Sequence, residues 1–185
     1  MKKIIIIIAA SFLGFASAAN AQSASSTATQ QASLSLTDAI AMTFTGSGTS
    51  TGGAVTIPFA TVSDYANGVA STAQALSVQS NKNFTITVNA NAANFTYTGS
   101  TTPSPTMPIS GVLAVKVSAN TTGGTIASPF SASSFATLTS TAQNLITNAT
   151  YGGAQNFSVI YNATPGFAYP AGTYATSVVY TATQL

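Results

Sequence analysis

The sequence predicts an all-β protein, most simply a sandwich of two antiparallel sheets with roughly nine or ten strands. Three observations carry this prediction. Ser, Thr, Val, Phe, Tyr and Ile dominate the chain, and Gly, Pro and Asn interrupt it at short intervals. Apolar and polar residues alternate with the period of a strand, whereas the helical spacing i, i+3, i+4 is essentially absent after residue 21.

Residues 1–21 have the layout of a secretory signal peptide. Two lysines open the chain, an apolar run covers residues 4–15, and the small residues Ala19-Asn20-Ala21 precede Gln22. The apolar run is too short for a membrane-spanning helix, so we expect cleavage before Gln22 and no membrane insertion afterwards. The predicted location is therefore extracellular or at the cell surface, reached through the periplasm. The remaining length suits one domain.

The mature chain opens with a flexible tail and a long alternating segment. Residues 22–29, "QSASSTAT", are small and polar, and we expect them to be flexible. A single β-sandwich domain is predicted over residues 30–185. Its first stretch, "QQASLSLTDAIAMTF", has period-2 alternation with its larger apolar residues on one face. These apolar-face residues are Ala32, Leu34, Leu36, Ile40, Met42 and Phe44.

Asp38 falls on the same face and interrupts the apolar series. One interpretation is a strand end or a bulge where the carboxylate turns to solvent. A second is a division between two functional halves, with residues 30–37 free to pair elsewhere and Ile40–Phe44 retained in the domain. A third is an intramolecular isopeptide bond between Lys116 and an asparagine, assisted by a nearby buried acid. The 13 residues from Ala32 to Phe44 would extend over roughly 44 Å at about 3.4 Å each, longer than a typical strand of about 17–20 Å.

Further strands follow at short intervals. Alternation is clearest in the segments 84–90, 111–119, 156–163 and 173–183. Weaker candidates are 54–60, 75–79, 94–98, 135–139 and 144–147. Loops are predicted at 45–53, at the proline-rich 98–108, and at the turn-rich corner 161–174.

Two segments resemble each other. The stretch from Ser71 and the stretch from Ser140 both read Ser-Thr-Ala-Gln-x-Leu, then a turn, then Asn-Phe-polar-aliphatic, and end in Asn-Ala. The second copy carries four extra residues around Gly152-Gly153. Two copies are too few for a solenoid, and they fit corresponding strand pairs in two facing sheets.

Charge is almost absent from the chain after the signal peptide. The remaining charged side chains are Lys82, Lys116, Asp38 and Asp64, which cancel. A neutral surface tolerates close packing against copies of the same chain and offers no electrostatic footprint for nucleic acid. With no cysteine, stability must come from packing and strand pairing rather than from disulfides.

The same composition leaves little chemistry. General acid–base catalysis needs histidine or tuned carboxylates, and zinc sites need Cys or His. Asp38 and Asp64 could in principle form a glycosidase pair or help to bind calcium, but no catalytic motif or Asp-rich loop accompanies them. The sequence therefore predicts no enzyme activity, no cofactor and no metal site.

The combination of features resembles small exported proteins of Gram-negative bacteria with Ig-like β-sandwich folds. These include pilin-like subunits of the spore-coat-U and chaperone–usher type. The resemblance rests on the layout of the whole mature chain and on the closing strand, in which Gly172, Tyr174, Val178 and Tyr180 match the Gly-x-Tyr pattern and the alternation that follows it. Many such pilins carry a disulfide, and this chain has none.

The resemblance implies donor-strand complementation, in which the N-terminal segment of one subunit completes the sheet of the next. The expected function is then a structural subunit of an extracellular filament or surface layer, with a further copy of the chain as its partner. A closed monomer, bent at Asp38, is the alternative fate of the segment. The alternative function is a monomeric carbohydrate-binding module, with glycans as partner and Phe167, Tyr169 and Tyr174 as its aromatic surface.

Overall fold

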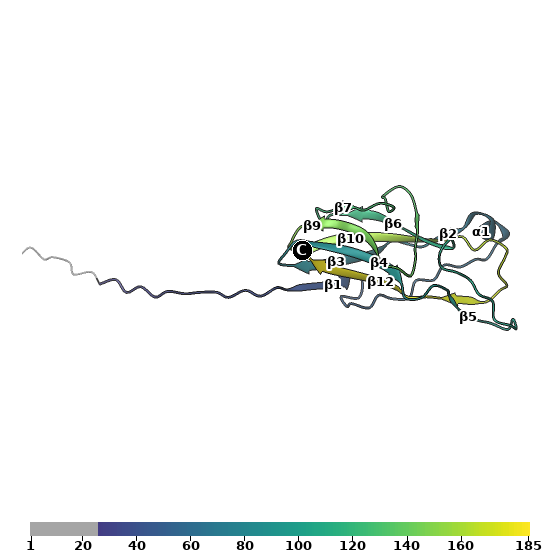
Figure 1. The fold of residues 1–185 in the computed structure, drawn as a ribbon, viewed down its shortest axis with the longest axis horizontal. Helices are drawn as coiled ribbons and strands as arrows, with labels where there is room; N and C mark the ends of the chain where they lie inside the picture. Colours follow the sequence, from purple (N-terminus) through teal and green to yellow (C-terminus); the bar gives the residue numbers. More distant parts are fainter. Residues whose placement is uncertain (1–25) are drawn as a thin grey trace, which may run out of the picture. The chain divides into compact units, whose positions relative to one another are not determined.

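The computed structural model describes residues 26–185 and confirms a mostly β protein. The predicted signal peptide and residues 22–25 lie outside the described residues. Residues 26–35 belong to one unit of the chain and contain no strand or helix, whereas Leu36–Leu185 form a compact unit. This unit holds twelve strands in antiparallel sheets and one short helix (Figure 1).

Two larger sheets and a small one make up the compact unit. The first sheet has the order β1-β3-β10-β6-β8, with β2 beside β10. Its strands are β1 (Ile40–Phe44), β2 (Val69–Ala70), β3 (Gln74–Ser80), β6 (Leu113–Asn120), β8 (Ala136–Thr137) and β10 (Gly152–Ala163). The second sheet, β12-β4-β9-β7, comprises β4 (Phe84–Ala90), β7 (Thr125–Ile126), β9 (Gln143–Ala149) and β12 (Val178–Gln184). The small sheet pairs β5 (Thr96–Thr98) with β11 (Thr173–Ala175).

Alternation in the sequence places one hydrophobic core between the larger sheets. On β4, Phe84, Ile86 and Val88 are fully buried, and the threonines and asparagine between them are half-exposed. The first sheet contributes buried side chains to the same cluster, among them Val115 on β6 and Phe157 on β10. The core therefore forms where the apolar faces of both sheets meet.

A tyrosine pair connects the two sheets inside the core. The hydroxyls of Tyr161 on β10 and Tyr180 on β12 lie 2.7 Å apart and share a hydrogen bond. The ring of Tyr180 also meets Phe157 at 6.1 Å between centroids. Burial raises the pKa of both hydroxyls, and that of Tyr180 is raised well above its ordinary value. The hydrogen bond between them needs a proton on at least one of the two hydroxyl oxygens.

From β3 onward the chain passes from one larger sheet to the other with each successive strand of these sheets. From β3 onward the chain enters β4, then β6, β7, β8, β9, β10 and β12, and apart from the small third sheet each step changes sheet. Only β1 and β3 are successive long strands paired within one sheet. Strand partners are therefore distant in sequence, and the closing of the sheets depends on long-range pairing.

The two similar segments occupy related places across the sheets. Each copy gives one strand to each sheet: β3 and β4 from the first copy, β10 and β9 from the second. The first strand of each copy pairs with the second strand of the other, β3 with β10 and β4 with β9. Equivalent residues are buried in both copies, namely Leu76 with Leu145 and Phe84 with Phe157. The extra residues of the second copy coincide with a register shift between Gly152 and Gln155.

Several expectations from the sequence differ from the structure. The predicted strand 173–183 is two strands, β11 and β12, which lie in different sheets, and the compact unit has twelve strands instead of nine or ten. The opening strand covers only Ile40–Phe44 of the alternating stretch. The segment 54–60 forms no strand, because Pro58 cannot donate to a ladder, although Ile57 and Phe59 still pack on the core. A helix, α1 (Val62–Asn67), occurs where none was expected. It is short, so its apolar periodicity is too brief to detect.

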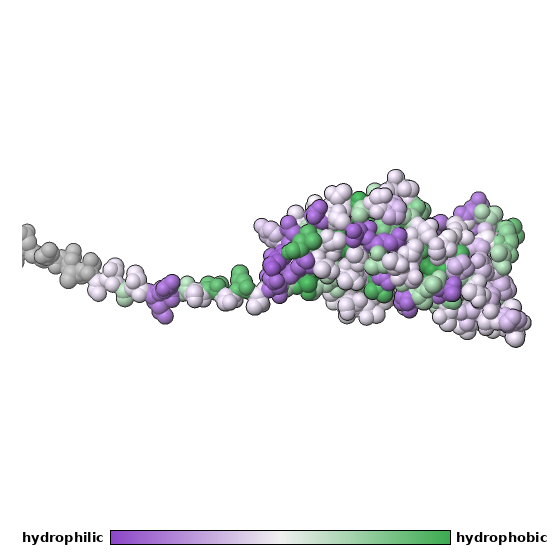
Figure 2. Space-filling view, viewed as in Figure 1, coloured by the Kyte–Doolittle hydropathy of each residue, from purple (hydrophilic) through white to green (hydrophobic). Residues whose placement is uncertain are grey.

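The surface reflects the scarcity of charge. In the face of the compact unit shown in Figure 2, pale spheres of intermediate hydropathy predominate, with scattered green and purple ones. This is the appearance expected from Ser, Thr, Ala and Gly. Along the described N-terminal segment, green spheres lie among pale and purple ones.

Candidate functional site

The residues of the predicted donor segment divide at Asp38. Ala32, Leu34 and Leu36 precede it, belong to no strand and are exposed, with exposed fractions of 84% for Leu34 and 85% for Leu36. Ile40, Met42 and Phe44 follow it on β1. The structure therefore does not bring the six residues together on one strand.

β1 is held in the first sheet by pairing and packing. It runs antiparallel to β3, from Ile40 opposite Ser80 to Phe44 opposite Leu76. Met42 and Phe44 pack against the core, and the Phe44 ring meets Tyr180 of β12 edge-on at 6.4 Å between centroids. Ile40 at the start of the strand is 37% exposed. The retained half of the segment thus increases in burial along the chain.

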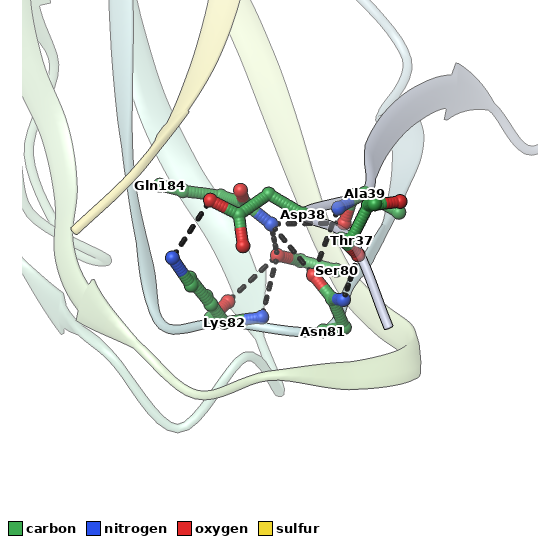
Figure 3. A network of polar contacts seen from close by, with 7 residues as sticks. All are labelled: Thr37, Asp38, Ala39, Ser80, Asn81, Lys82 and Gln184. Carbon is green, nitrogen blue, oxygen red and sulfur yellow. Dashed lines mark hydrogen bonds and ion pairs between the residues drawn. The ribbon is translucent and has the colours of Figure 1, made fainter. Parts of the chain in front are cut away.

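A network of polar contacts fixes the chain just before β1 (Figure 3). We call this set the anchor network; its members are Thr37, Asp38, Ala39, Ser80, Asn81, Lys82 and Gln184. It joins the entry to β1, the turn between β3 and β4, and the end of β12, three places far apart in the sequence.

Asn81 is the centre of the anchor network. Its side-chain Nδ2 donates to the Thr37 carbonyl at 2.8 Å, and its Oδ1 accepts from the Ala39 backbone N–H at 2.9 Å. Its own backbone N–H donates to the Ala39 carbonyl at 3.2 Å. The Asn81 amide therefore continues the β1–β3 ladder for two more residues, in place of a strand backbone.

Gln184 contributes from the second sheet. Its Nε2 lies 2.9 Å from the Ala39 carbonyl, 3.0 Å from Ser80 Oγ and 3.0 Å from Asn81 Oδ1. Ser80 is buried, and its hydroxyl donates to the Lys82 carbonyl at 2.6 Å. One amide thus ties the edge strands β1 and β12 together at the end where the N-terminal segment enters the domain.

Asp38 forms an ion pair with Lys82 at 2.7 Å. Both side chains are about half exposed, at 62% and 49%, so solvent screens the pair and we expect it to contribute less than about 1 kcal/mol. Its main effect is on where β1 begins. A charged residue on the apolar face prevents β1 from extending towards the N-terminus as a buried strand. This agrees with the interpretation of Asp38 as a strand end.

Asp64 has a separate, local role. Thr61 is the N-cap of α1; its hydroxyl accepts from the Asp64 N–H at 3.3 Å, while the Asp64 carboxylate accepts from the N–H groups of Thr61 and Ala60 at 2.7 and 2.9 Å. This is a capping box. The backbone hydrogen bonds from Thr61 and Ala60 lower the pKa of the Asp64 carboxyl. The spacing Thr61-x-x-Asp64 was visible in the sequence and is the signal by which α1 could have been found.

The aromatic residues of the second predicted site are grouped with Tyr65 on α1 and Tyr97 on β5. Figure 1 shows these two elements at the end of the compact unit opposite the C-terminus. The aromatic residues form two groups. Tyr65 stacks on Phe167 at 5.6 Å with 24° between the ring planes, and Phe59 adjoins Tyr65. Tyr174 meets Tyr97 at 5.0 Å and Tyr169 at 6.4 Å.

These aromatic residues differ in their availability. Phe167 is 67% exposed, whereas Tyr169 and Tyr174 are half-buried. The Tyr174 hydroxyl donates to the Pro170 carbonyl at 2.9 Å and the Tyr97 hydroxyl to the Ala171 carbonyl at 3.1 Å, so both hold the loop before β11. Burial and the neighbouring Tyr97 raise the pKa of the Tyr174 hydroxyl. Of the three predicted residues, Phe167 is thus the one that presents an open ring.

Comparison with known proteins adds no identification. No protein-family model and no curated protein matches this chain. Within residues 26–185 there is no helix with the length and apolar character needed to cross a membrane. The same residues contain no group of three or more Asp, Glu, His or Cys side chains placed to bind a metal ion. The class that fold and site define is therefore a mostly β domain with an anchored, apolar N-terminal segment.

Proposed function

We propose that the chain is a structural subunit of an extracellular filament or surface layer. In this proposal residues 32–36 of one subunit add a strand to a neighbouring subunit. The observation that carries the proposal is the exposure of Leu34 and Leu36, at 84% and 85%, on a segment whose alternation is that of a half-buried strand. Single exposed apolar residues are ordinary, whereas two leucines in strand register are placed to enter the same face of a partner's sheet.

The anchor network supports a division of labour within the segment. Residues 40–44 are retained as β1, and residues 37–39 are tied to Asn81 and Gln184. The apolar residues of 32–36 lie immediately before this fixed point. A donated segment links two subunits firmly only if the residues that follow it are held in their own domain. Here residues 37–39 are held by Asn81, next to the first sheet, and by Gln184 of the second sheet.

The order of the strands favours a jelly roll over the Ig-like sandwich that the sequence predicted, and we infer this finer fold type. In immunoglobulin domains successive strands such as D and E or F and G lie in one sheet. Here each successive strand of the two larger sheets after β3 lies in the other sheet from the one before it. The order β3-β10-β6-β8 facing β4-β9-β7 is that of an eight-stranded jelly roll lacking one strand, with β1 and β12 added beside it.

Geometry and charge are compatible with a filament. Donation from each subunit to the next is a head-to-tail contact that does not close on itself, so it builds an open chain of subunits. With two aspartates and two lysines after the signal peptide, copies do not repel one another. Export through the periplasm to the cell surface and a non-catalytic role are part of the proposal.

The test compares two charge substitutions in the same segment. Leu34→Asp places a carboxylate on the apolar face, whereas Ser35→Asp places the same charge on the opposite face. We expect wild-type protein starting at Gln22 to form filaments in electron micrographs and a ladder on an unboiled denaturing gel. Leu34→Asp and deletion of residues 22–37 should abolish both, while Ser35→Asp should assemble. Filaments from Leu34→Asp would refute donation of this segment.

The aromatic end of the domain favours one alternative, a monomeric glycan-binding module. The open ring of Phe167, supported by Tyr65, resembles the flat aromatic surface on which a sugar ring can stack. This alternative expects a monomer at high concentration that binds glycans on an array and loses binding in Phe167→Ala. Glycan binding by assembled filaments that is lost in the same variant would assign both roles to the chain.

A further inference from the structure

Two strands of the compact unit have an open side facing the same hollow. β6 has β10 on one side and β8 on the other, but β8 matches only Ala114 and Val115. Among the described residues, the part of β6 from Ser118 to Asn120 has no strand on its outer side. β7 pairs with β9 alone, so its other side is also open. Backbone groups on an unpaired strand side are available to a further strand.

The hollow between these strands has a volume of about 660 Å³. We call it the β6–β7 groove; its lining residues are Val117–Asn120, Gly124–Ile126 and Phe130–Ala132. Val117 and Phe130 are buried and Ile126 is half-buried, and most of the remaining lining residues are small. The open surface of the groove is therefore formed by the half-buried Ile126 and small side chains, which leave room for larger ones.

The groove coincides with the place of the strand that the jelly-roll order lacks. In that order the strand that is missing here would follow β7 in sequence and lie on its outer side. In this chain residues 127–135, "ASPFSASSF", connect β7 to β8 without forming a strand. Pro129 and the serine-rich turn, in which Ser131 Oγ accepts from the Ser134 N–H at 2.9 Å, keep this link irregular.

We propose that the β6–β7 groove is the acceptor for residues 32–36 of a second copy of the chain, which supply the lacking strand beside β7. This inference rests on the proposed function. Leu34 and Leu36 would lie over Ile126 and the small lining residues of the groove, and Ser33 and Ser35 would face solvent. Residues 26–37 and the lining residues are all uncharged, so pairing them buries no charge.

The donor must come from another copy because the same chain cannot reach. Leu36 directly precedes Thr37, whose carbonyl is held by Asn81 beside β1 and β3. β1 and β6 are three strand positions apart in the first sheet. Three positions correspond to roughly 14 Å, whereas one residue spans at most about 3.6 Å. Leu36 of the same subunit is therefore held away from the groove.

The other edges of the sheets are less suitable acceptors. β1 and β12 are also each paired on one side only, but the Phe44–Tyr180 contact and the hydrogen bond from Gln184 to Ala39 hold these two edge strands against each other. A second hollow beside β1, lined by residues 39–41, 79–81, 152 and 153, adjoins the Asp38–Lys82 ion pair. An apolar strand placed there would bring its leucines next to charged groups.

Cysteine cross-linking tests the proposal directly, because the chain contains no cysteine of its own. Ser33→Cys or Ser35→Cys is combined with Thr125→Cys on β7, and the matched control combines each with Thr181→Cys on β12. Thr125 and Thr181 are both exposed. Paired strands bring Cα atoms to about 4.5–5.5 Å, within disulfide range. Assembly of every variant is first checked by electron microscopy under reducing conditions.

We expect oxidation to give a covalent ladder on a boiled, non-reducing gel for a Thr125→Cys combination and only single chains for the Thr181→Cys controls. Three results would overturn the groove as acceptor and leave the filament proposal standing. The first is a ladder with Thr181→Cys, and the second is filaments that form but give no ladder with either Thr125→Cys or Thr181→Cys. The third is a cross-link that forms only within single chains. Absence of filaments from the wild-type protein would instead refute the filament proposal itself.

Discussion

At the scale of single residues, Asn81 does the most to define where the domain begins. Its side chain bonds both the carbonyl of Thr37 and the N–H of Ala39, so it replaces two backbone contacts at the entry to β1. The Asp38–Lys82 pair, exposed like Asn81, adds one contact between two side chains and none to the backbone. An amide held in two directions is worth more here than a surface charge pair.

Asn81→Ala is therefore expected to lower the free energy of unfolding by about 1–2 kcal/mol, since it removes two hydrogen bonds to the backbone. Lys82→Ala at the neighbouring position should cost less than about 1 kcal/mol. Urea unfolding of both variants, each carrying Leu34→Asp to keep the protein monomeric, measures the difference. A larger loss in Lys82→Ala would contradict the role given to Asn81.

At the scale of elements, the short helix α1 exists because of its ends rather than its faces. None of its residues is buried, and the Thr61–Asp64 capping box supplies the hydrogen bonds that its first turn needs. Tyr65 on the helix then supports Phe167. The position of the aromatic end thus depends on two polar residues.

The capping carboxylate predicts a pH dependence. Because the pKa of Asp64 is lowered in the fold, its contribution to stability is present above the ordinary value of 3.8 and is lost as the pH falls through the lowered pKa. Asp64→Ala should therefore unfold at lower denaturant concentration than wild type at pH 7, with the gap narrowing near pH 2. A gap that is constant with pH would show that the charge of the carboxylate is not what stabilises the cap.

Sequence patterns predicted the buried elements better than the polar site. Alternation in residues 84–90 gave the bounds of β4, and Asp38 marked the point before which β1 does not extend. Alternation alone favoured a strand at residues 54–60, but this segment contains Pro58 and forms no strand. The anchor network could not be predicted, because Asn81 and Gln184 are ordinary polar residues whose partners become neighbours only after the sheets have formed.

At the scale of the whole molecule, the two sheets are joined inside the core by a polar contact as well as by packing. The Tyr161–Tyr180 hydrogen bond spans from β10 to β12. Both hydroxyls have a raised pKa through burial, so the fold favours their protonated forms. Charge on either one would be buried between the sheets.

Alkaline pH should therefore separate the sheets. The stabilisation is fully present below the ordinary pKa of 10.0 and is lost as the pH rises towards the raised values. The loss can reach about 1.4 kcal/mol per pH unit for a hydroxyl that stays protonated only in the fold. The double variant Tyr161→Phe/Tyr180→Phe leaves no unpaired hydroxyl, and its melting temperature should fall less than that of wild type between pH 9 and 11.5. Equal falls would place the alkaline sensitivity elsewhere.

The pairing of β1 with β3 also determines how the domain would respond to force. Five residue pairs connect the two strands, and their hydrogen bonds lie across the strand direction. A pull along β1 loads these bonds together in shear, whereas a pull across it would break them one after another. In a filament linked through residues 32–36, tension would enter each domain through the anchor network. Such a subunit would act as a mechanical link that resists stretching and yields to peeling.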